Sequence, residues 1–410
     1  MSVFVAGIAM TRFGPQPERT VKHLVKEAFD SAVADAGVSV RDIGAVFFAN
    51  AMQGMVEGQG ISGQVALRAA GLEGVPIVNV ENACASGATA FWLACRHLES
   101  GAAEIVLALG AEKMAYRDEL RRGRVMAAFG GGIDLENADA TFAQLASLGR
   151  GISADEGQGH RTPFMDFYAM VCRAHMARFG TTQRQLAVIA SKNHGHAVEN
   201  ERCHYRTPIS IEDVLSARAL SYPLTVPMCS PLSDGAAAIV LCTEAGLKRL
   251  RSSHPRVRVL ASELRSAATR DWADLDDHVV RRAADAAYAK AGLTPSEIDV
   301  AEVHDAAAFG ELFMSELLGF CPFGEGGRLA ESGATTLGGR IPINPSGGLE
   351  SKGHPIGASG LAQLFELTHQ LRGAAGARQV EGARTAIQEN GGGLLGVEEA
   401  AAVVSILQRQ

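Results

Sequence analysis

Cys84 lies at the junction between an apolar segment and a helix-like run of small residues. The residues before it, 75–80, are typical of a buried strand, and those from Ser86 onward are typical of a helix. A cysteine at a helix N-terminus is close to the positive end of the helix dipole and to free N–H groups, which both favour the thiolate. Because the thiolate is the reactive form, this position predicts a nucleophile. The alternative is a structural cysteine, since free cysteines are usually buried.

Two histidines lie where they could act on a reacting group. His354 lies between glycines in Gly353-His-Pro-Ile-Gly, which predicts a tight loop leading into a helix. A histidine there can face a cavity and act as a base near neutral pH. His304 and Asp305 follow the apolar strand Val300-Ala-Glu-Val, at the strand edge where open α/β folds bind ligands, and could bind a carbonyl oxygen through a water. The structural alternatives are a loop histidine and a turn in which Asp305 caps a helix.

The elements that must position these residues occur twice in the chain. Residues 32–43 and 287–298 both read as an amphipathic helix closed by a glycine, followed by a Ser39 or Thr294 cap and a short turn. The closing glycines, Gly37 and Gly292, are separated by the same number of residues as the final isoleucines, Ile43 and Ile298. Such a repeat predicts a duplicated unit, and the alternation of strands with helices predicts an α/β fold with mostly parallel strands.

The duplication predicts two sheets, one in each half of the chain. The expected halves are residues 1–250 and 251–410, each closed by an apolar strand. Residues from 113 to about 215 have no counterpart in the second half. They are rich in glycine and polar residues and contain a helix-like run at 164–176. We expect this insert to form a loop domain over the active site.

The composition argues against several classes of protein. The 410 residues are 47% hydrophobic and 20% charged, which fits a folded chain of two lobes. The formal charge of −7 is spread along the chain, without the basic stripe of a nucleic-acid-binding protein. A short basic run would suit either an anionic ligand or a solvated loop: Arg121, Arg122 and Arg124. No apolar run approaches the roughly 20 residues of a membrane span, and no signal peptide is evident, so a cytoplasmic protein is expected.

The spacing of cysteines and histidines indicates neither a disulfide framework nor a metal site. The chain has seven cysteines, an odd number, and no Cys-x-x-Cys pair. Three cysteines within predicted helices or strands are expected to pack in the core: Cys95, Cys172 and Cys242. Three histidines lack a carboxylate or cysteine at ligand spacing and are expected to be polar surface residues: His194, His196 and His204.

Three segments resemble the thiolase superfamily, and most closely its sterol carrier protein thiolases and their bacterial relatives. They are Asn82-Ala-Cys-Ala-Ser-Gly, Val303-His-Asp-Ala and Asn344-Pro-Ser-Gly-Gly-Leu-Glu-Ser-Lys-Gly-His-Pro-Ile-Gly-Ala-Ser-Gly. The resemblance covers essentially the whole chain. It implies the thiolase fold, in which two βαβαβαββ halves form a five-layered αβαβα sandwich with an inserted loop domain. It also implies coenzyme A as co-substrate, with no permanently bound cofactor.

The resemblance implies a role for each residue of these segments. Cys84 would carry the acyl group, and its backbone N–H would line an oxyanion hole to which Gly391 adds a second N–H. His354 would activate Cys84 and help to polarise the thioester carbonyl. His304 would take the place of the asparagine in the family's Asn-Glu-Ala-Phe motif, or of the histidine in His-Asp-Cys-Phe. The insert would hold the nucleotide and pantetheine of CoA.

The chain departs from the family pattern at the second catalytic cysteine, which moves the α-proton in thiolases. That cysteine lies in a C-terminal Cys-x-Gly motif or in His-Asp-Cys-Phe, but here the segments read Glu389-Asn-Gly-Gly-Gly and His304-Asp-Ala-Ala. One alignment places Glu389 at the vacant position, and the other places Asn390 there. A carboxylate in a site without water could have a raised pKa and carry the proton instead.

The implied activity is that of a thiolase-type acyltransferase, which forms or cleaves the carbon–carbon bond of a 3-oxoacyl-CoA through an acyl-cysteine. Without a proton-transfer group, a different acyl transfer or a retro-aldol cleavage of a CoA ester is the alternative. A CoA-ester or lipid-binding protein is the non-enzymatic alternative. The family further implies a homodimer or homotetramer. Some bacterial relatives work with a small zinc-ribbon OB-fold subunit, so such a partner is a further expectation.

Overall fold

The computed structural model describes residues 1–155, 157 and 161–410, and its strands form a mixed sheet. Nine strands pair in the order β3-β2-β4-β7-β1-β8-β11-β10-β9, and β5 (Ala219–Ser221) pairs separately with β6 (Leu224–Thr225). The nine strands are β1 (Val3–Met10), β2 (Val46–Ala49), β3 (Ile77–Val80), β4 (Ile105–Glu112), β7 (Gly235–Thr243), β8 (Val257–Ser266), β9 (Val300–Glu302), β10 (Thr385–Gly392) and β11 (Ala401–Arg409).

The strand order repeats, as the sequence duplication predicts. The first half gives β3-β2-β4-β7-β1, and the second gives β9-β10-β11-β8. In the second half, Ala301 of β9 forms an isolated parallel β-bridge with Ile343. This bridge takes the place that β3 has beside β2 in the first half. Two separate sheets were expected, but β1 pairs antiparallel with β8 from Val3 to Val5, which joins the halves into one ladder. This pairing satisfies backbone groups that would otherwise lie at two free sheet edges.

The repeated helix–turn units have the predicted ends. Helix α1 (Val21–Ala36) ends at Gly37 with φ 64°, and α11 (Val279–Ala291) ends at Gly292 with φ 69°. Glycine adopts this left-handed conformation without the steric cost that other residues incur. Each unit continues into a short 3₁₀ turn with a capping box, begun by Ser39 in one half and by Thr294 in the other.

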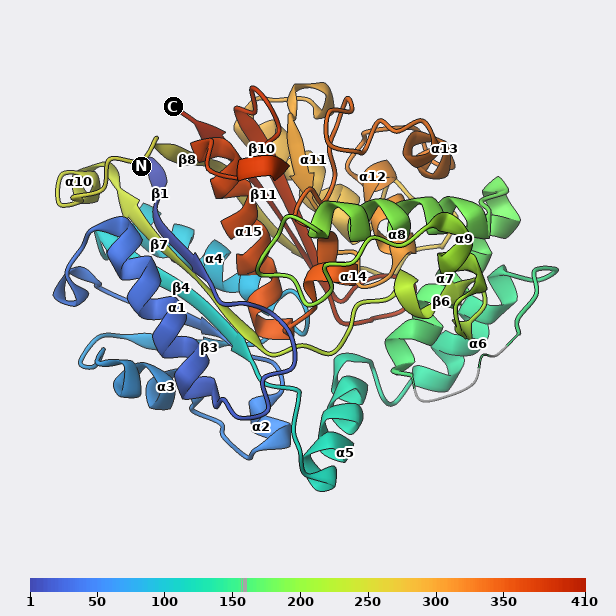
Figure 1. Ribbon diagram of the computed structural model, residues 1–410, viewed down its shortest axis with the longest axis horizontal. Coiled ribbons are helices and arrows are strands. Elements are labelled where there is room, and N and C mark those ends of the chain that lie inside the picture. Colours follow the sequence, from blue (N-terminus) through green and yellow to red (C-terminus); the bar gives the residue numbers. More distant parts are fainter. Residues whose placement is uncertain (156, 158–160) are drawn as a thin grey trace.

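Apolar side chains divide the two halves into five layers. Helices α1 and α3 (Ser62–Ala70) pack on the outer face of the first half. Helices α4 (Ser86–Glu99) and α15 (Ile356–Arg372) share a central cluster with strands of both halves, and α11 and α12 (Ala308–Leu317) cover the outer face of the second half. Figure 1 shows α15 in the middle of the molecule with α1 and α3 to one side. The layers place the N-terminal ends of α4 and α15 next to each other.

The two central helices approach closely because small residues lie where they meet. A Cβ added to Gly87 of α4 would lie 2.9 Å from the Gly357 carbonyl oxygen and 3.2 Å from the Gly360 nitrogen of α15. Any side chain at Gly87 would therefore force the helices apart. The segments around Cys84 and His354 begin these two helices, so this contact fixes the distance between them.

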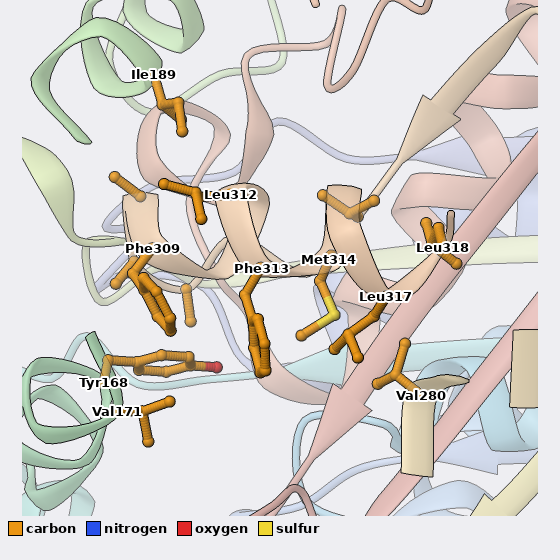
Figure 2. Packing of buried hydrophobic residues seen from close by; sticks show 14 of the residues in the cluster. Tyr168, Val171, Ile189, Val280, Phe309, Leu312, Phe313, Met314, Leu317 and Leu318 are labelled. Atoms are coloured by element: carbon orange, nitrogen blue, oxygen red, sulfur yellow. The ribbon is translucent and has the colours of Figure 1, made fainter. Parts of the chain in front are cut away.

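The inserted segment is mostly helical and packs mainly on the second half, although its first helix packs against residues 52–56 of the first half. Its helices are α5 (Glu119–Ala128), α6 (Ala138–Leu148), α7 (Pro163–Phe179), α8 (Gln183–Ala197) and α9 (Ile211–Ser216). Residues 156 and 158–160 of this segment lie outside the described residues. Figure 1 shows α6–α9 gathered on the side of the molecule opposite α1 and α3. In Figure 2, Tyr168 and Val171 of α7 and Ile189 of α8 lie around Phe309 and Leu312 of α12.

Two expectations for polar residues of the insert need correction. The arginines at 121, 122 and 124 belong to α5 rather than to a loop; they are exposed, and Arg124 donates a hydrogen bond to the Val56 carbonyl. His194 and His196 are buried rather than on the surface, because α8 packs against the second half of the chain. His196 Nδ1 bonds with the Asn344 carbonyl, and His194 Nε2 with that of Pro227.

The remaining helices are short, and the core cysteines lie as predicted. The short helices are α2 (Gln53–Val56), α10 (Glu244–Leu247), α13 (Gly326–Glu331) and α14 (Gly348–Lys352). The expected division between residues 250 and 251 falls between α10 and β8. Cys95, Cys172 and Cys242 are buried free thiols, which confirms that they pack in the core. Within the described residues, no helix is long and apolar enough to cross a membrane.

Candidate active site

The structure brings together the three residues that the sequence singled out for chemistry. Cys84 lies between β3 and α4, His304 follows β9, and His354 precedes α15. A sulfur or ring nitrogen from each lies within 4.8 Å of the others. The two imidazole rings are 5.0 Å apart at an interplanar angle of 74°. Cysteine and histidine also ligate zinc, and in the described part of the chain these three are close enough together to hold a metal ion.

A strained turn positions Cys84 at the start of α4. Ala83 has φ 46°, a conformation that is costly for a residue with a side chain. Its N–H donates to the Glu81 carboxylate, and its carbonyl accepts from the Ser86 hydroxyl, so both sides of the turn are fixed. The Ser86 hydroxyl also accepts the N–H of Asn82. These bonds hold the chain in the conformation that presents Cys84 to the cavity.

The Cys84 side chain is a thiol rather than the thiolate that its helix position predicted. Burial raises its pKa to about 12, with a further contribution from the negative charges of Glu112 and Glu81. Its own backbone N–H and that of Gly393 lower the pKa, but the cost of burying the charge exceeds this effect. Cys84 therefore needs a base that takes its proton when it reacts.

His354 has the protonation state of such a base. Its Nδ1 lies 2.6 Å from the Ser359 hydroxyl oxygen, and that hydroxyl donates to the Pro355 carbonyl. The hydroxyl can therefore accept from His354, which assigns the ring proton to Nδ1. Nε2 is left with a free lone pair and has no hydrogen-bond partner among the described residues. Burial and the neighbouring His304 hold the pKa of His354 well below its usual range, so the ring is neutral at pH 7.

His304 has the opposite tautomer. Its Nδ1 lies 3.1 Å from the Asn390 amide nitrogen, which can only donate, so Nδ1 accepts and Nε2 carries the proton. Burial lowers the pKa of His304 to about 4, so this ring is neutral as well. One histidine thus offers a proton acceptor and the other an N–H donor. The adjacent Asp305 is not part of the site, because its carboxylate accepts the N–H of Leu349 and caps α14.

Glu389 and Asn390 project to opposite faces of β10, as neighbours in a strand do. Asn390 contacts His304, whereas the Glu389 carboxylate accepts the backbone N–H of His304 through Oε2. Glu389 Oε1 is buried without a hydrogen-bond partner and lies 3.4 Å from the position of a Cβ on Gly391. Burial raises the pKa of Glu389 to about 8, and the nearby carboxyl of Glu399 adds to this effect. Both residues suggested for the vacant cysteine position therefore contact His304.

A cavity of about 960 Å³ leads to the three central residues. Cys84, His304, His354 and the glycines at 391–393 line one part of it, while Glu389 and Asn390 are not among the described lining residues. Two exposed arginines, Arg206 and Arg218, also line the cavity. Aromatic residues of the insert form an apolar wall: Phe129, Phe164, Phe167 and Tyr168. A cavity of this size and character suits a long ligand with an anionic outer end.

Several cavity residues were missed by the sequence analysis. Cys229 lines the cavity beside Ala306, and its backbone forms an isolated antiparallel β-bridge with Ala307. It is therefore close to the His304-Asp-Ala-Ala segment, one of the two places where the family has its second cysteine. Glu399 also lines the cavity and lies just before β11. No motif surrounds these residues, so only the fold shows that they share the site.

Comparison with known proteins shows which family the chain resembles over most of its length. Residues 3–216 match the family described as thiolase, N-terminal domain, and residues 261–409 match the thiolase C-terminal domain-like family. The chain is 37% identical over 399 residues to sterol carrier protein 2 of Homo sapiens, covering 95% of this chain and 69% of that protein. It is 36% identical to an acetyl-CoA acetyltransferase of Methanothermobacter thermautotrophicus, covering 95% and 96% of the two chains. It is 32% identical to benzoylsuccinyl-CoA thiolase subunit BbsB of Thauera aromatica, covering 92% and 91%.

Two solved structures share the fold at lower sequence identity. The Ltp2-ChsH2(DUF35) aldolase matches with a TM-score of 0.80 and 22% identity, covering 100% of this chain and 98% of that one. Human mitochondrial 3-ketoacyl-CoA thiolase matches with a TM-score of 0.70 and 17% identity, covering 100% and 99%. The matched families cover most of the sequence, and the fold and the duplicated halves agree with them. The chain belongs to the thiolase family.

Proposed function

We propose that this protein is a thiolase-type acyltransferase that cleaves or forms the carbon–carbon bond of a 3-oxoacyl-CoA through an acyl group on Cys84. The observation that carries the proposal is the pairing of a Cys84 thiol with a neutral His354 whose Nε2 is free, in the wall of a large cavity. Coenzyme A is the co-substrate, and the exposed arginines that line the cavity suit its phosphates.

In the cleavage direction, Cys84 Sγ attacks the C3 carbonyl carbon while His354 Nε2 takes the thiol proton. The C3 oxygen gains negative charge, which the N–H of His304 Nε2 and backbone N–H groups near Cys84 can stabilise. We assign the backbone donors to Cys84 and Gly391, with Gly393 supporting the sulfur. The C2–C3 bond then breaks, leaving the acyl group on Cys84, and C2 takes a proton. The thiol of CoA next attacks the acyl group and restores Cys84.

We assign the transfer of the C2 proton to Glu389. Its carboxyl is buried with one free oxygen, its pKa of about 8 allows it to gain or lose a proton near neutral pH, and Gly391 has no side chain to separate it from the cavity. Glu389→Gln should leave acylation of Cys84 nearly normal but reduce exchange of the α-proton of a bound acyl-CoA by about a hundredfold. Deuterium loss from an α-deuterated acyl-CoA, followed by mass spectrometry, measures this exchange.

The pH dependence provides a second readout of Glu389. Removal of the α-proton needs the carboxylate, so the exchange rate should rise with pH up to about 8 and then level off. The Glu389→Gln variant should lack this rise, and Glu331→Gln on exposed α13 serves as the matched control. Equal exchange in the wild type and Glu389→Gln would contradict the assignment and leave Asn390, His304 or Cys229 as candidates.

Retro-aldol cleavage of a CoA ester remains the second candidate, because neither family position for the second cysteine holds one in this chain. The two reactions differ in their products. A thiolase given a 3-oxoacyl-CoA and CoA releases two acyl-CoA esters, whereas a retro-aldol enzyme given a 3-hydroxyacyl-CoA releases a carbonyl compound and one acyl-CoA. Chromatography of the CoA esters decides between them. Turnover of the 3-hydroxyacyl-CoA alone would overturn the thiolase proposal.

We further propose that the chain acts as a homo-oligomer and accepts a small second subunit. Strand β3 is at the end of the sheet and exposes Val78, so a β3 strand from a second copy could pair with it. One relative is named as a thiolase subunit, and one structure with the same fold is named as a complex with a DUF35 protein. Light scattering of the purified chain, alone and mixed with a DUF35-type protein, tests both expectations.

A further inference from the structure

A second, small void lies directly beside the main cavity. Its volume is about 10 Å³, and three residues line both spaces: Phe167, Tyr168 and Glu399. The void has room for a single oxygen-sized group but not for a carbon chain. Most of its wall is apolar, from Phe309, Phe313 and other residues of the insert and the second half. Polar groups in such a wall need partners, because unpaired buried polar groups destabilise a protein.

Three polar side chains from distant segments meet at this void: Tyr168, His278 and Glu399. Tyr168 comes from α7, and Figure 2 shows its ring beneath Phe309 with the hydroxyl directed towards Phe313. No described residue hydrogen-bonds to this hydroxyl in the structure. His278 and Glu399 are buried, with 1% and 6% of their surfaces exposed. Glu399 Oε2 lies 3.4 Å from His278 Nε2 and makes no hydrogen bond with the described residues.

The hydrogen-bonding character of the three groups is complementary. His278 Nδ1 accepts the N–H of Val280, so the ring proton lies on Nε2, which can donate. Burial holds the pKa of His278 well below its usual range, so the ring is neutral. Glu399 can accept through its carboxylate, and Tyr168 can donate or accept. Together they offer donors and an acceptor to one oxygen atom that itself carries a hydrogen.

We propose that Tyr168, His278 and Glu399 form a subsite that binds a hydroxyl group on the acyl chain of the substrate. This inference rests on the proposed function, in which the cavity holds an acyl-CoA. The hydroxyl oxygen enters the void, accepts a hydrogen bond from His278 or Tyr168, and donates one to Glu399. The aromatic wall packs against the carbons before it. A chain without the hydroxyl leaves these buried groups unpaired, which is the most effective way for a site to reject an analogue.

The test compares acyl-CoAs that differ only in a terminal hydroxyl, at chain lengths from four to about twelve carbons. The rate of Cys84 acylation by each is measured by rapid quench and mass spectrometry of the intact protein. At one or two neighbouring chain lengths, the hydroxylated ester should react at least about tenfold faster than its unsubstituted partner. No preference at any length would overturn the subsite. If no ester acylates Cys84 at all, the proposed function fails and the inference fails with it.

Variants separate recognition from a structural role. Tyr168→Phe and Glu399→Gln should each lower the preference to about twofold or less, because they slow acylation by the hydroxylated ester more than acylation by its unsubstituted partner. Tyr205→Phe, which changes a cavity-lining tyrosine outside the void, is the matched control and should keep the preference. If the variants slow both esters equally, the trio is not a recognition site. Thermal unfolding shows whether each variant is as stable as the wild type. If Glu399→Gln is unstable, the result for Tyr168→Phe alone decides.

Discussion

Replacing Cys84 with serine is expected to abolish turnover while leaving the fold intact. Serine is nearly isosteric with cysteine, so the strained turn at Ala83 and its bonds to Glu81 and Ser86 should remain. Its hydroxyl is a far weaker nucleophile, and the site surrounds it with groups that suit a thiol. We expect the rate of CoA-ester turnover to fall by about a thousandfold or more. Steady-state assays and thermal unfolding of the same preparation measure both effects.

The control for this substitution is Cys321→Ser. Cys321 is a partly exposed free thiol, and it is not one of the described residues that line the cavity. This variant should keep wild-type turnover, which would show that loss of activity is specific to Cys84. If Cys84→Ser retained more than a few per cent of the wild-type rate, Cys84 would not be the nucleophile. Cys229 would then be the next thiol to examine, because it also lines the cavity.

Replacing His354 with alanine is expected to slow acylation of Cys84 by about a hundredfold or more. The Cys84 thiol has a pKa of about 12, so almost none of it ionises at pH 7 unless a neighbouring base takes the proton. His354 Nε2 is free for this purpose, while the ring is held by Ser359. Loss of the imidazole leaves His304, whose accepting nitrogen is already occupied by Asn390. Rapid-quench kinetics with an acyl-CoA measure the acylation step directly.

A pH series adds a diagnostic to this experiment. In the His354→Ala variant, the residual acylation should increase with pH, because hydroxide must then generate the thiolate. The wild-type rate should vary much less between pH 6 and 8, since its base stays neutral across that range. His369→Ala, near the C-terminal end of α15, the helix that follows His354, is the matched control. An unchanged acylation rate in His354→Ala would assign this residue a structural role.

The central residues could be predicted from the sequence because each lies in a short segment with its own signature. Cys84 precedes a helix of small residues, and His354 lies in a long glycine-rich motif, so local pattern and family resemblance agree. The duplicated helix–turn units at Gly37 and Gly292 were predictable for the same reason, since glycine there is required by a left-handed backbone. Features that depend on neighbouring residues in sequence were therefore accessible.

Features that depend on burial or on distant segments were not accessible. Sequence predicted a Cys84 thiolate from the helix end, but the cost of burial outweighs that effect in the folded protein. The void brings together Tyr168, His278 and Glu399, which belong to three separate segments, and no local pattern marks any of them. The pairing of β1 with β8 likewise depends on how two halves pack rather than on either strand alone.

Intact-protein mass spectrometry can show directly whether Cys84 carries the acyl group. The protein is mixed with an excess of an acyl-CoA in the absence of added CoA and quenched in acid. Its intact mass is then measured, and its peptides are sequenced. We expect a mass increase of one acyl group less the hydrogen that it replaces, located on the peptide that contains Cys84. This increase should be absent in Cys84→Ser and should disappear when CoA is added before the quench. An acyl group found on another residue, or no acyl-enzyme with any acyl-CoA of the series, would show that Cys84 is not the acyl carrier.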